Sequence, residues 1–171
     1  MSQIRILVSA CLLGEPVRYT GADARSASPI LAKWLSDGRV VRFCPELAGG
    51  LGVPRPAAEI RGADGLMVLS GAARVVTASG SDVTEAFLRG ARLALEAALA
   101  ANVRLAVLKD GSPSCSSDVI YDGSFTGQKR QGHGVTTALL EQAGIRVFSE
   151  ARIDEAAKYL DRLESERQPQ R

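Results

Sequence analysis

The stretch that decides the fold is residues 103–123, which reads VRLAVLKDGSPSCSSDVIYDG. Residues 103–108 are apolar at nearly every position, a pattern typical of a short strand buried on both faces of a parallel sheet. The chain then turns at once into a polar loop of glycine, proline and serines that contains Cys115. Ligands of open α/β sheets bind outside the carboxyl ends of the strands, where the loops diverge. The pattern therefore predicts that Cys115 lies where a ligand would bind.

The other cysteines follow apolar runs in the same way. Residues 4–10 run into Cys11, residues 40–43 run into Cys44, and Cys115 is the only further cysteine of the chain. A single buried cysteine is more often a small hydrophobic residue than a ligand. Three at strand ends, each before a loop rich in glycine, proline or serine, favour one shared binding site.

The flanking residues predict an α/β single domain, with a mostly parallel sheet flanked by helices and the active site at the carboxyl ends of its strands. This domain should span residues 1–164, and a polar tail at 165–171 is expected to be partly disordered. The residue patterns predict helices at 28–35, 82–101, 135–143 and 153–163, and a further strand at 145–148.

Three local features complete this prediction. Residues 44–60 contain many glycines and prolines, so we expect a shaped loop there and no regular element. Residues 66–69 and 75–76 are expected to pair as a short hairpin. Asp82 and Glu85 fit a capping box at the start of the longest helix.

The composition excludes several classes of protein. A net charge of +2, from 21 Lys+Arg and 19 Asp+Glu, produces no field typical of a nucleic-acid or membrane-surface protein, although small anionic ligands remain compatible. No apolar run approaches the ~20 residues that span a bilayer, and the N-terminus lacks the pattern of a signal peptide. An odd number of cysteines without close pairs argues against a disulfide framework. We therefore expect a cytoplasmic protein with reduced thiols and no membrane or stable nucleic-acid partner.

Three thiolates facing one crevice would hold a metal and leave it an open coordination position. Zinc would favour close cysteine pairs or histidine ligands, but His133 is the only histidine of the chain. Soft thiolates without a nitrogen ligand suit an iron–sulfur cluster better. Spacings of 33 residues (44 − 11) and 71 residues (115 − 44) match no short motif, so the residues alone leave the metal open.

A set of short motifs, in order from residue 4 to about residue 148, resembles the thiouracil desulfidase family, which was long catalogued as a domain of unknown function. No single motif is specific, but the ordered set is. The motifs are Ser9-Ala10-Cys11-Leu12-Leu13-Gly14, Arg18-Tyr19 with Gly21, Cys44-Pro45-Glu46 with Gly49-Gly50, Pro54-Arg55-Pro56, Ser112-Pro113-Ser114-Cys115, Tyr121-Asp122-Gly123 and Gly134-Val135-Thr136.

The resemblance implies a 4Fe-4S cluster with three cysteine ligands, Cys11, Cys44 and Cys115, and one open iron that takes sulfur from a thiolated uracil. Glu46 and Ser112 match the catalytic glutamate and serine of the family. The chain departs from the family pattern at two positions. Gly111 stands where a basic residue is usual, and Ser116 stands where glycine is usual. These changes bear on the range of substrates.

The expected chemistry is a hydrolytic, non-redox desulfuration. A soft thiocarbonyl sulfur would coordinate the open iron, and Glu46 would activate the water that attacks the carbon. Sulfide would remain on the cluster, and uracil would leave carrying oxygen. Without its neighbouring cysteine, Glu46 would be interpreted as a capping carboxylate.

The expected substrate is a small thiolated pyrimidine, 2- or 4-thiouracil or a thiouridine nucleotide. Arg55, Lys109 and Ser114 are the candidate substrate-binding residues, although both cations are equally compatible with loop charges. His133 lies between two glycines before a helix and could act as a base or help to cradle a phosphate, but solvent exposure is the simpler interpretation. The oligomeric state is left open.

Two other functions remain as alternatives. One is a cysteine-persulfide sulfurtransferase that uses Cys115 as the carrier. The other is a metal-stabilised binding module for RNA or a partner, without catalysis.

Overall fold

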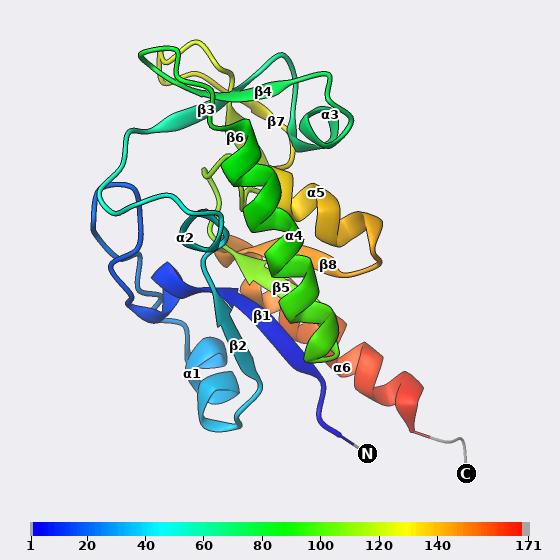
Figure 1. Ribbon diagram of the computed structural model, residues 1–171. Coiled ribbons are helices and arrows are strands. Elements are labelled where there is room, and N and C mark those ends of the chain that lie inside the picture. Colours follow the sequence, from blue (N-terminus) through cyan, green and yellow to red (C-terminus); the bar gives the residue numbers. More distant parts are fainter. Residues whose placement is uncertain (1, 169–171) are drawn as a thin grey trace.

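Four parallel strands form the centre of the molecule, in the spatial order β2–β1–β5–β8 (Figure 1). They are β1 (Arg5–Ser9), β2 (Val40–Phe43), β5 (Val103–Leu108) and β8 (Arg146–Ser149). The computed structural model describes residues 2–168. Because β1 and β5 pair in parallel, with Leu7 opposite Ala106, their carboxyl ends meet at one edge of the sheet.

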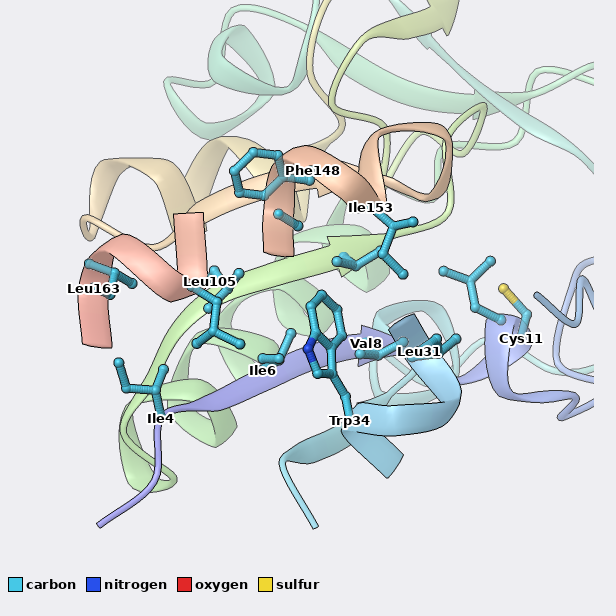
Figure 2. Close-up of a cluster of buried hydrophobic side chains, with 14 residues drawn as sticks. Ile4, Ile6, Val8, Cys11, Leu31, Trp34, Leu105, Phe148, Ile153 and Leu163 are labelled. Atoms are coloured by element: carbon cyan, nitrogen blue, oxygen red, sulfur yellow. The ribbon is translucent and has the colours of Figure 1, made fainter. Parts of the chain in front are cut away.

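Helices cover both faces of this sheet, so the predicted fold class is confirmed. They are α1 (Pro29–Ser36), α4 (Thr84–Ala100), α5 (Val135–Gln142) and α6 (Ile153–Arg167). On one face, Ile6, Val8 and Leu105 pack against Leu31 and Trp34 of α1 and against α6 (Figure 2). On the other face, neighbouring strand residues pack against α4 and α5. This division follows from the alternation of side chains along a strand.

A second layer lies at the end of the molecule near the start of α4 (Figure 1). Ile60, Val68, Val75 and Ile120 form its core, together with Phe87 of α4. Its elements are β3 (Ala58–Arg61), α3 (Gly65–Leu69), β4 (Arg74–Thr77), β6 (Val119–Tyr121) and β7 (Lys129–Gln131). Strand β3 pairs with β4, and strand β6 pairs with β7; both pairs are antiparallel. Three single-turn elements remain: η1 (Ala10–Leu13), α2 (Pro45–Ala48) and η2 (Glu150–Arg152).

The long elements lie where the sequence predicts them, but the predicted hairpin of residues 66–69 with 75–76 is wrong. Residues 65–69 form helix α3. Asp64 caps the start of this helix, because its side chain accepts the N–H of Met67 at 3.3 Å. The true partner of β4 is β3, inside the stretch expected to be irregular. α2 also lies in that stretch, and the β6–β7 hairpin was not predicted at all.

The capping box is likewise wrong, because α4 begins at Thr84 with Val83 at the cap position. Asp82 accepts the N–H of Thr84 at 2.9 Å but also pairs with Arg74, outside the helix. At the other end of the chain, α6 continues to Arg167, so residues 165–167 of the expected tail are helical. Residues 169–171 lie outside the described part. Within residues 2–168, no helix is both long and apolar enough to cross a membrane.

Candidate active site at the carboxyl edge of the sheet

The three cysteines line one cavity of about 360 Å³ at the carboxyl edge of the sheet. Cys11 lies in η1 directly after β1, and Cys44 lies between β2 and α2. Cys115 lies in the loop after β5. The parallel strands therefore bring together thiols that are far apart in the sequence, as expected from their positions.

Burial raises the pKa of all three thiols. It raises the pKa of Cys11 to about 11, with a further contribution from Cys44. Burial also raises the pKa of Cys44, although the backbone N–H of Leu47 opposes it. For Cys115, burial is the largest cause, and Glu46, Cys44 and Cys11 add to it. Cys115 thus senses both other thiols and Cys11 senses Cys44, and a bound cation would be needed to keep all three as thiolates.

This donor set fits an iron–sulfur cluster better than a single ion. In the part of the chain that the structure describes, no group of three or more His, Cys, Asp or Glu side chains converges closely enough to hold one metal ion. A cluster carries its own iron atoms, each of which takes one thiolate. The three thiols share a cavity but do not meet at one point, and no histidine lies among them. They therefore match a cluster in which each thiolate binds a different iron atom.

Glu46 and Ser112 meet beside the thiols, which is where the catalytic residues were expected. Ser112 Oγ donates to Glu46 Oε1 at 2.9 Å and accepts the N–H groups of Ser114 at 3.0 Å and Cys115 at 3.2 Å. Arg55 approaches the other carboxylate oxygen, with Nε at 2.8 Å and Nη2 at 2.6 Å from Oε2. The side chains of Arg55 and Glu46 are only 7% and 13% exposed. Ser112 therefore joins the loop of Cys115 to the carboxylate that follows Cys44.

Two glycines allow α2, which carries Glu46, to contact α4 directly. A Cβ atom on Gly90 would lie 2.0 Å from the carbonyl oxygen of Pro45, and one on Gly49 would lie 2.0 Å from that of Ala86. Only residues without a side chain permit this approach. Gly90, a glycine inside α4, thus helps to place the carboxylate of Glu46.

The candidate substrate-binding residues differ in their surroundings. Arg55 is engaged by Glu46, and its Nη1 also donates to the carbonyl of Gly52 at 3.0 Å. Lys109 Nζ pairs with Glu150 at 2.8 Å, although the residue lines the cavity. Ser114 is fully buried, with its hydroxyl 2.7 Å from that of Thr136, and it is not among the residues that line the cavity. Its environment is that of a structural residue.

His133 lies outside the cavity, and its carbonyl accepts the N–H of Gly65 at 2.7 Å. A Cβ on the adjacent Gly134 would lie 2.4 Å from the backbone of Ser114. The glycines around His133 therefore serve the packing of the Cys115 loop. The phosphate cradle considered for this segment has no support in the structure.

The cavity also has lining residues that sequence reasoning did not select. Arg18 and Lys129 contribute cations that form no salt bridge within residues 2–168, and Lys129 lies over the ring of Tyr121 at 5.3 Å from its centroid. Glu59 accepts the N–H groups of Gly123 and Phe125 at 3.0 and 3.2 Å. Arg18 and Tyr121 belong to the motifs quoted above, whereas no local signal marks Glu59 or Lys129.

These features define the class: an α/β protein whose parallel sheet presents three thiols and an ion-paired carboxylate at one edge. The family model described as 2-thiouracil desulfurase matches residues 6–152, and the chain belongs to this family. A solved structure of a [4Fe-4S]-dependent thiouracil desulfidase, TudS, is similar with a TM-score of 0.85 at 50% identity, covering 93% of this chain and 99% of that chain. The uncharacterized protein YbbK of Bacillus subtilis (strain 168) is 49% identical over 150 residues, which are 88% of this chain and 98% of the relative.

Proposed function

We propose that this protein is a 4Fe-4S-dependent thiouracil desulfidase that converts a thiolated uracil and water into uracil and hydrogen sulfide. The observation that carries the proposal is the hydrogen-bonded Glu46–Ser112 pair in the same cavity as Cys11, Cys44 and Cys115. A hydrolytic reaction needs a proton acceptor beside the reacting carbon, and this pair supplies one. The family membership and the similarity to TudS support the same activity.

Cys11, Cys44 and Cys115 would hold the cluster, which supplies an open iron as a Lewis acid for the soft thiocarbonyl sulfur. Glu46 would take the proton of the attacking water. The Ser112 hydroxyl, which donates to Glu46 Oε1 at 2.9 Å, would hold the carboxylate in place, because its two acceptor positions are taken by the N–H groups of Ser114 and Cys115. Arg55 would keep the carboxylate oriented, because two of its nitrogens donate to the opposite oxygen. The burial of Glu46 limits its access to bulk water, so the proton acceptor stays available to the bound substrate.

The charges of the cavity favour a substrate with a negatively charged group. Arg55 and Lys109 are already paired with carboxylates, whereas Arg18 and Lys129 line the cavity without a salt bridge inside residues 2–168. Gly111 brings no cation to the position where the family pattern carries one. We therefore propose Arg18 and Lys129 as the residues that meet a phosphate of a thiouridine nucleotide. Lys129→Gln should then raise KM for the nucleotide and leave KM for the free base unchanged.

The persulfide-carrier alternative is disfavoured by the environment of Cys115. A carrier must present its sulfur to a second protein, but Cys115 is only 6% exposed at the base of a loop. Its raised pKa also lowers the fraction of nucleophilic thiolate.

The test compares Glu46→Gln with wild type after anaerobic reconstitution, with iron content, uracil and sulfide measured together. We expect full iron and a turnover at least ~100-fold slower, because positioned proton transfer is worth ~10²–10⁴ in rate. Glu164→Gln is the matched control. It removes a carboxylate that pairs with Arg39 at the same N···O distance of 2.6 Å, but at the opposite end of β2.

Near-normal turnover of Glu46→Gln with an intact cluster would refute the role of Glu46. Replacement of any of the three cysteines by serine should remove most of the iron and all activity, because two thiolates hold a cluster poorly. A variant that kept its iron and its rate would show that its cysteine is not a ligand. A wild-type protein that takes up no cluster would refute the proposed function as a whole.

A further inference from the structure

Glu59 is a buried carboxylate of the cavity that the proposed reaction does not use. It lies in β3, is 9% exposed and lines the cavity. One of its oxygens, Oε1, accepts the backbone N–H groups of Gly123 and Phe125 at 3.0 and 3.2 Å. The other oxygen, Oε2, accepts no hydrogen bond from residues 2–168, and no cation in that range pairs with Glu59. The side chain therefore keeps a free acceptor.

A buried carboxylate without a cation is unusual, because the loss of hydration disfavours its charge unless hydrogen bonds or an opposite charge replace the water. Both oxygens of a carboxylate accept hydrogen bonds. The turn after β6 meets only half of this requirement, since its two N–H groups bind the same oxygen. A ligand that brings a hydrogen-bond donor into the cavity would meet the other half.

The turn after β6 also holds the carboxylate in a fixed position. Gly123 has a φ of 90° and packs on β3, where a Cβ atom would lie 2.6 Å from the carbonyl oxygen of Ile60. Only glycine permits this contact. Because the N–H groups of the turn orient the side chain in advance, a ligand meets a preorganised acceptor and little side-chain entropy is lost on binding.

Glu59 lies in the layer that carries Lys129, whereas the thiols belong to the four-stranded sheet. Strand β3 packs beside β6, and the β6–β7 hairpin contributes Tyr121 and Lys129 to the cavity (Figure 1). The three cysteines instead follow strands of the parallel sheet. With the sulfur of a base at the cysteines and a phosphate at Lys129, the sugar is the part of a nucleotide that joins the two ends.

The donors of the substrate decide what the free carboxylate oxygen can bind. A phosphate, a carbonyl and a thiocarbonyl offer acceptors, and a carboxylate cannot donate to them. Ribose hydroxyls are donors, and an acidic side chain that binds a ribose hydroxyl is a common element of nucleotide sites. The ring N–H of the base is the other donor, but it belongs to the ring whose sulfur must reach the cysteines.

We propose that Glu59 determines specificity for the sugar, because its free carboxylate oxygen accepts a hydrogen bond from a ribose hydroxyl of a thiouridine nucleotide. The inference rests on the proposed function, since it places the sulfur of the base at the cysteines. A hydrogen bond to a charged group changes affinity by about 10–150-fold. A nucleotide without ribose hydroxyls should lose that factor.

The experiment measures nucleotide binding to the reconstituted protein by titration calorimetry, which does not depend on turnover. The ligands are uridine 5′-monophosphate, its 2′,3′-dideoxy analogue and uracil, so the two nucleotides differ only in the hydroxyls. The variants are Glu59→Ala and Glu59→Gln, of which the second keeps an acceptor for the two N–H groups. Glu141→Gln is the matched control, because Glu141 also accepts a backbone N–H, that of Val147 at 2.8 Å, but does not line the cavity.

We expect wild type and Glu141→Gln to bind uridine 5′-monophosphate about 10-fold more tightly, or better, than the dideoxy analogue. Glu59→Ala should bind both nucleotides with similar Kd. Glu59→Gln should give an intermediate ratio, because a neutral amide forms the weaker hydrogen bond. Equal Kd values in wild type, no binding of either nucleotide, or an unchanged ratio in both Glu59 variants would overturn the inference. Equal weakening of uracil and nucleotide by Glu59→Gln would also overturn it, because Glu59 would then contact the ring N–H.

Sulfide release separates this inference from the proposed function. A wild type that releases sulfide from 4-thiouracil but does not distinguish the two nucleotides would overturn the role of Glu59 and leave the desulfidase standing. A wild type that distinguishes them but loads no cluster and releases no sulfide would refute the proposed function, while the contact of Glu59 with ribose would stand.

If neither Glu59 variant folds, hydrogen exchange of the wild type decides the question. Uridine 5′-monophosphate should slow exchange in residues 122–125 more than the dideoxy analogue does, because it holds the carboxylate to which this turn is bonded. Equal protection by the two nucleotides would overturn the inference.

Discussion

Replacement of Gly90 by alanine tests whether the contact between α4 and α2 places the catalytic carboxylate. In an ordinary helix this change stabilises by about 1 kcal/mol, because alanine has the higher helix propensity. Here the new Cβ would lie 2.0 Å from the carbonyl oxygen of Pro45, whereas such contacts are essentially never shorter than 3.0 Å. The two helices must therefore separate by about 1 Å (3.0 − 2.0). Overpacking of this kind costs up to about 3 kcal/mol, so we expect a net loss of about 2 kcal/mol.

The same displacement should reduce activity, because Pro45 lies between Cys44 and Glu46. A misplacement of about 1 Å at a reacting group can cost ~10²-fold in rate. Urea unfolding followed by the fluorescence of the single tryptophan, Trp34, measures the stability, and turnover of the reconstituted protein measures the second effect. Gly52→Ala is the control, because its Cβ would meet nothing within 4 Å. A Gly90→Ala protein that is more stable than wild type and fully active would refute the reasoning.

Three further predictions concern single side chains. Arg55→Ala should destabilise the apoprotein by about 3–5 kcal/mol in urea unfolding, because the carboxylate of Glu46, whose side chain is only 13% exposed, is left without its ion-pair partner; a loss below 1 kcal/mol would show that the pair contributes little. Glu59→Ala removes the acceptor of two backbone N–H groups of the turn 122–125, so hydrogen exchange there should accelerate, and unchanged protection would contradict this. Asp82 has a pKa lowered to about 2, chiefly by its bonds with Thr84, so its contribution to stability is present above pH 3.8 and is lost as pH falls toward 2. Asp82→Asn should therefore flatten the decline in urea midpoint between pH 4 and 2, and an unchanged slope would disprove the linkage.

The sequence predicted the elements that have a strong local pattern. The apolar run of β5 and the small-residue helix α4 are examples, and the apolar runs of β1, β2 and β5 predicted the three strand-end thiols. The sequence did not reveal β3 or the β6–β7 hairpin, because their identity depends on distant partners. Residues 129–131 are exposed and polar, and they form a strand only because Val119 lies opposite Gln131. Residues 66–69 are apolar enough to form either a strand or a helix, and the cap that Asp64 provides favours the helix.

The sequence by itself determined which chemical groups are available: three soft thiols, the Glu46 carboxylate and the Ser112 hydroxyl, each at a position that a parallel sheet brings to one edge. It could not determine which charges are neutralised, because ion pairing depends on distances between atoms that are far apart in the chain. Only the tertiary structure showed that Arg55 is engaged by Glu46 and Lys109 by Glu150. It alone places the hydroxyl of Ser9 2.9 Å from the backbone nitrogen of Lys109, one hundred residues further along the chain. Hydrogen bonds act over about 3 Å, so only the folded chain decides which groups they join.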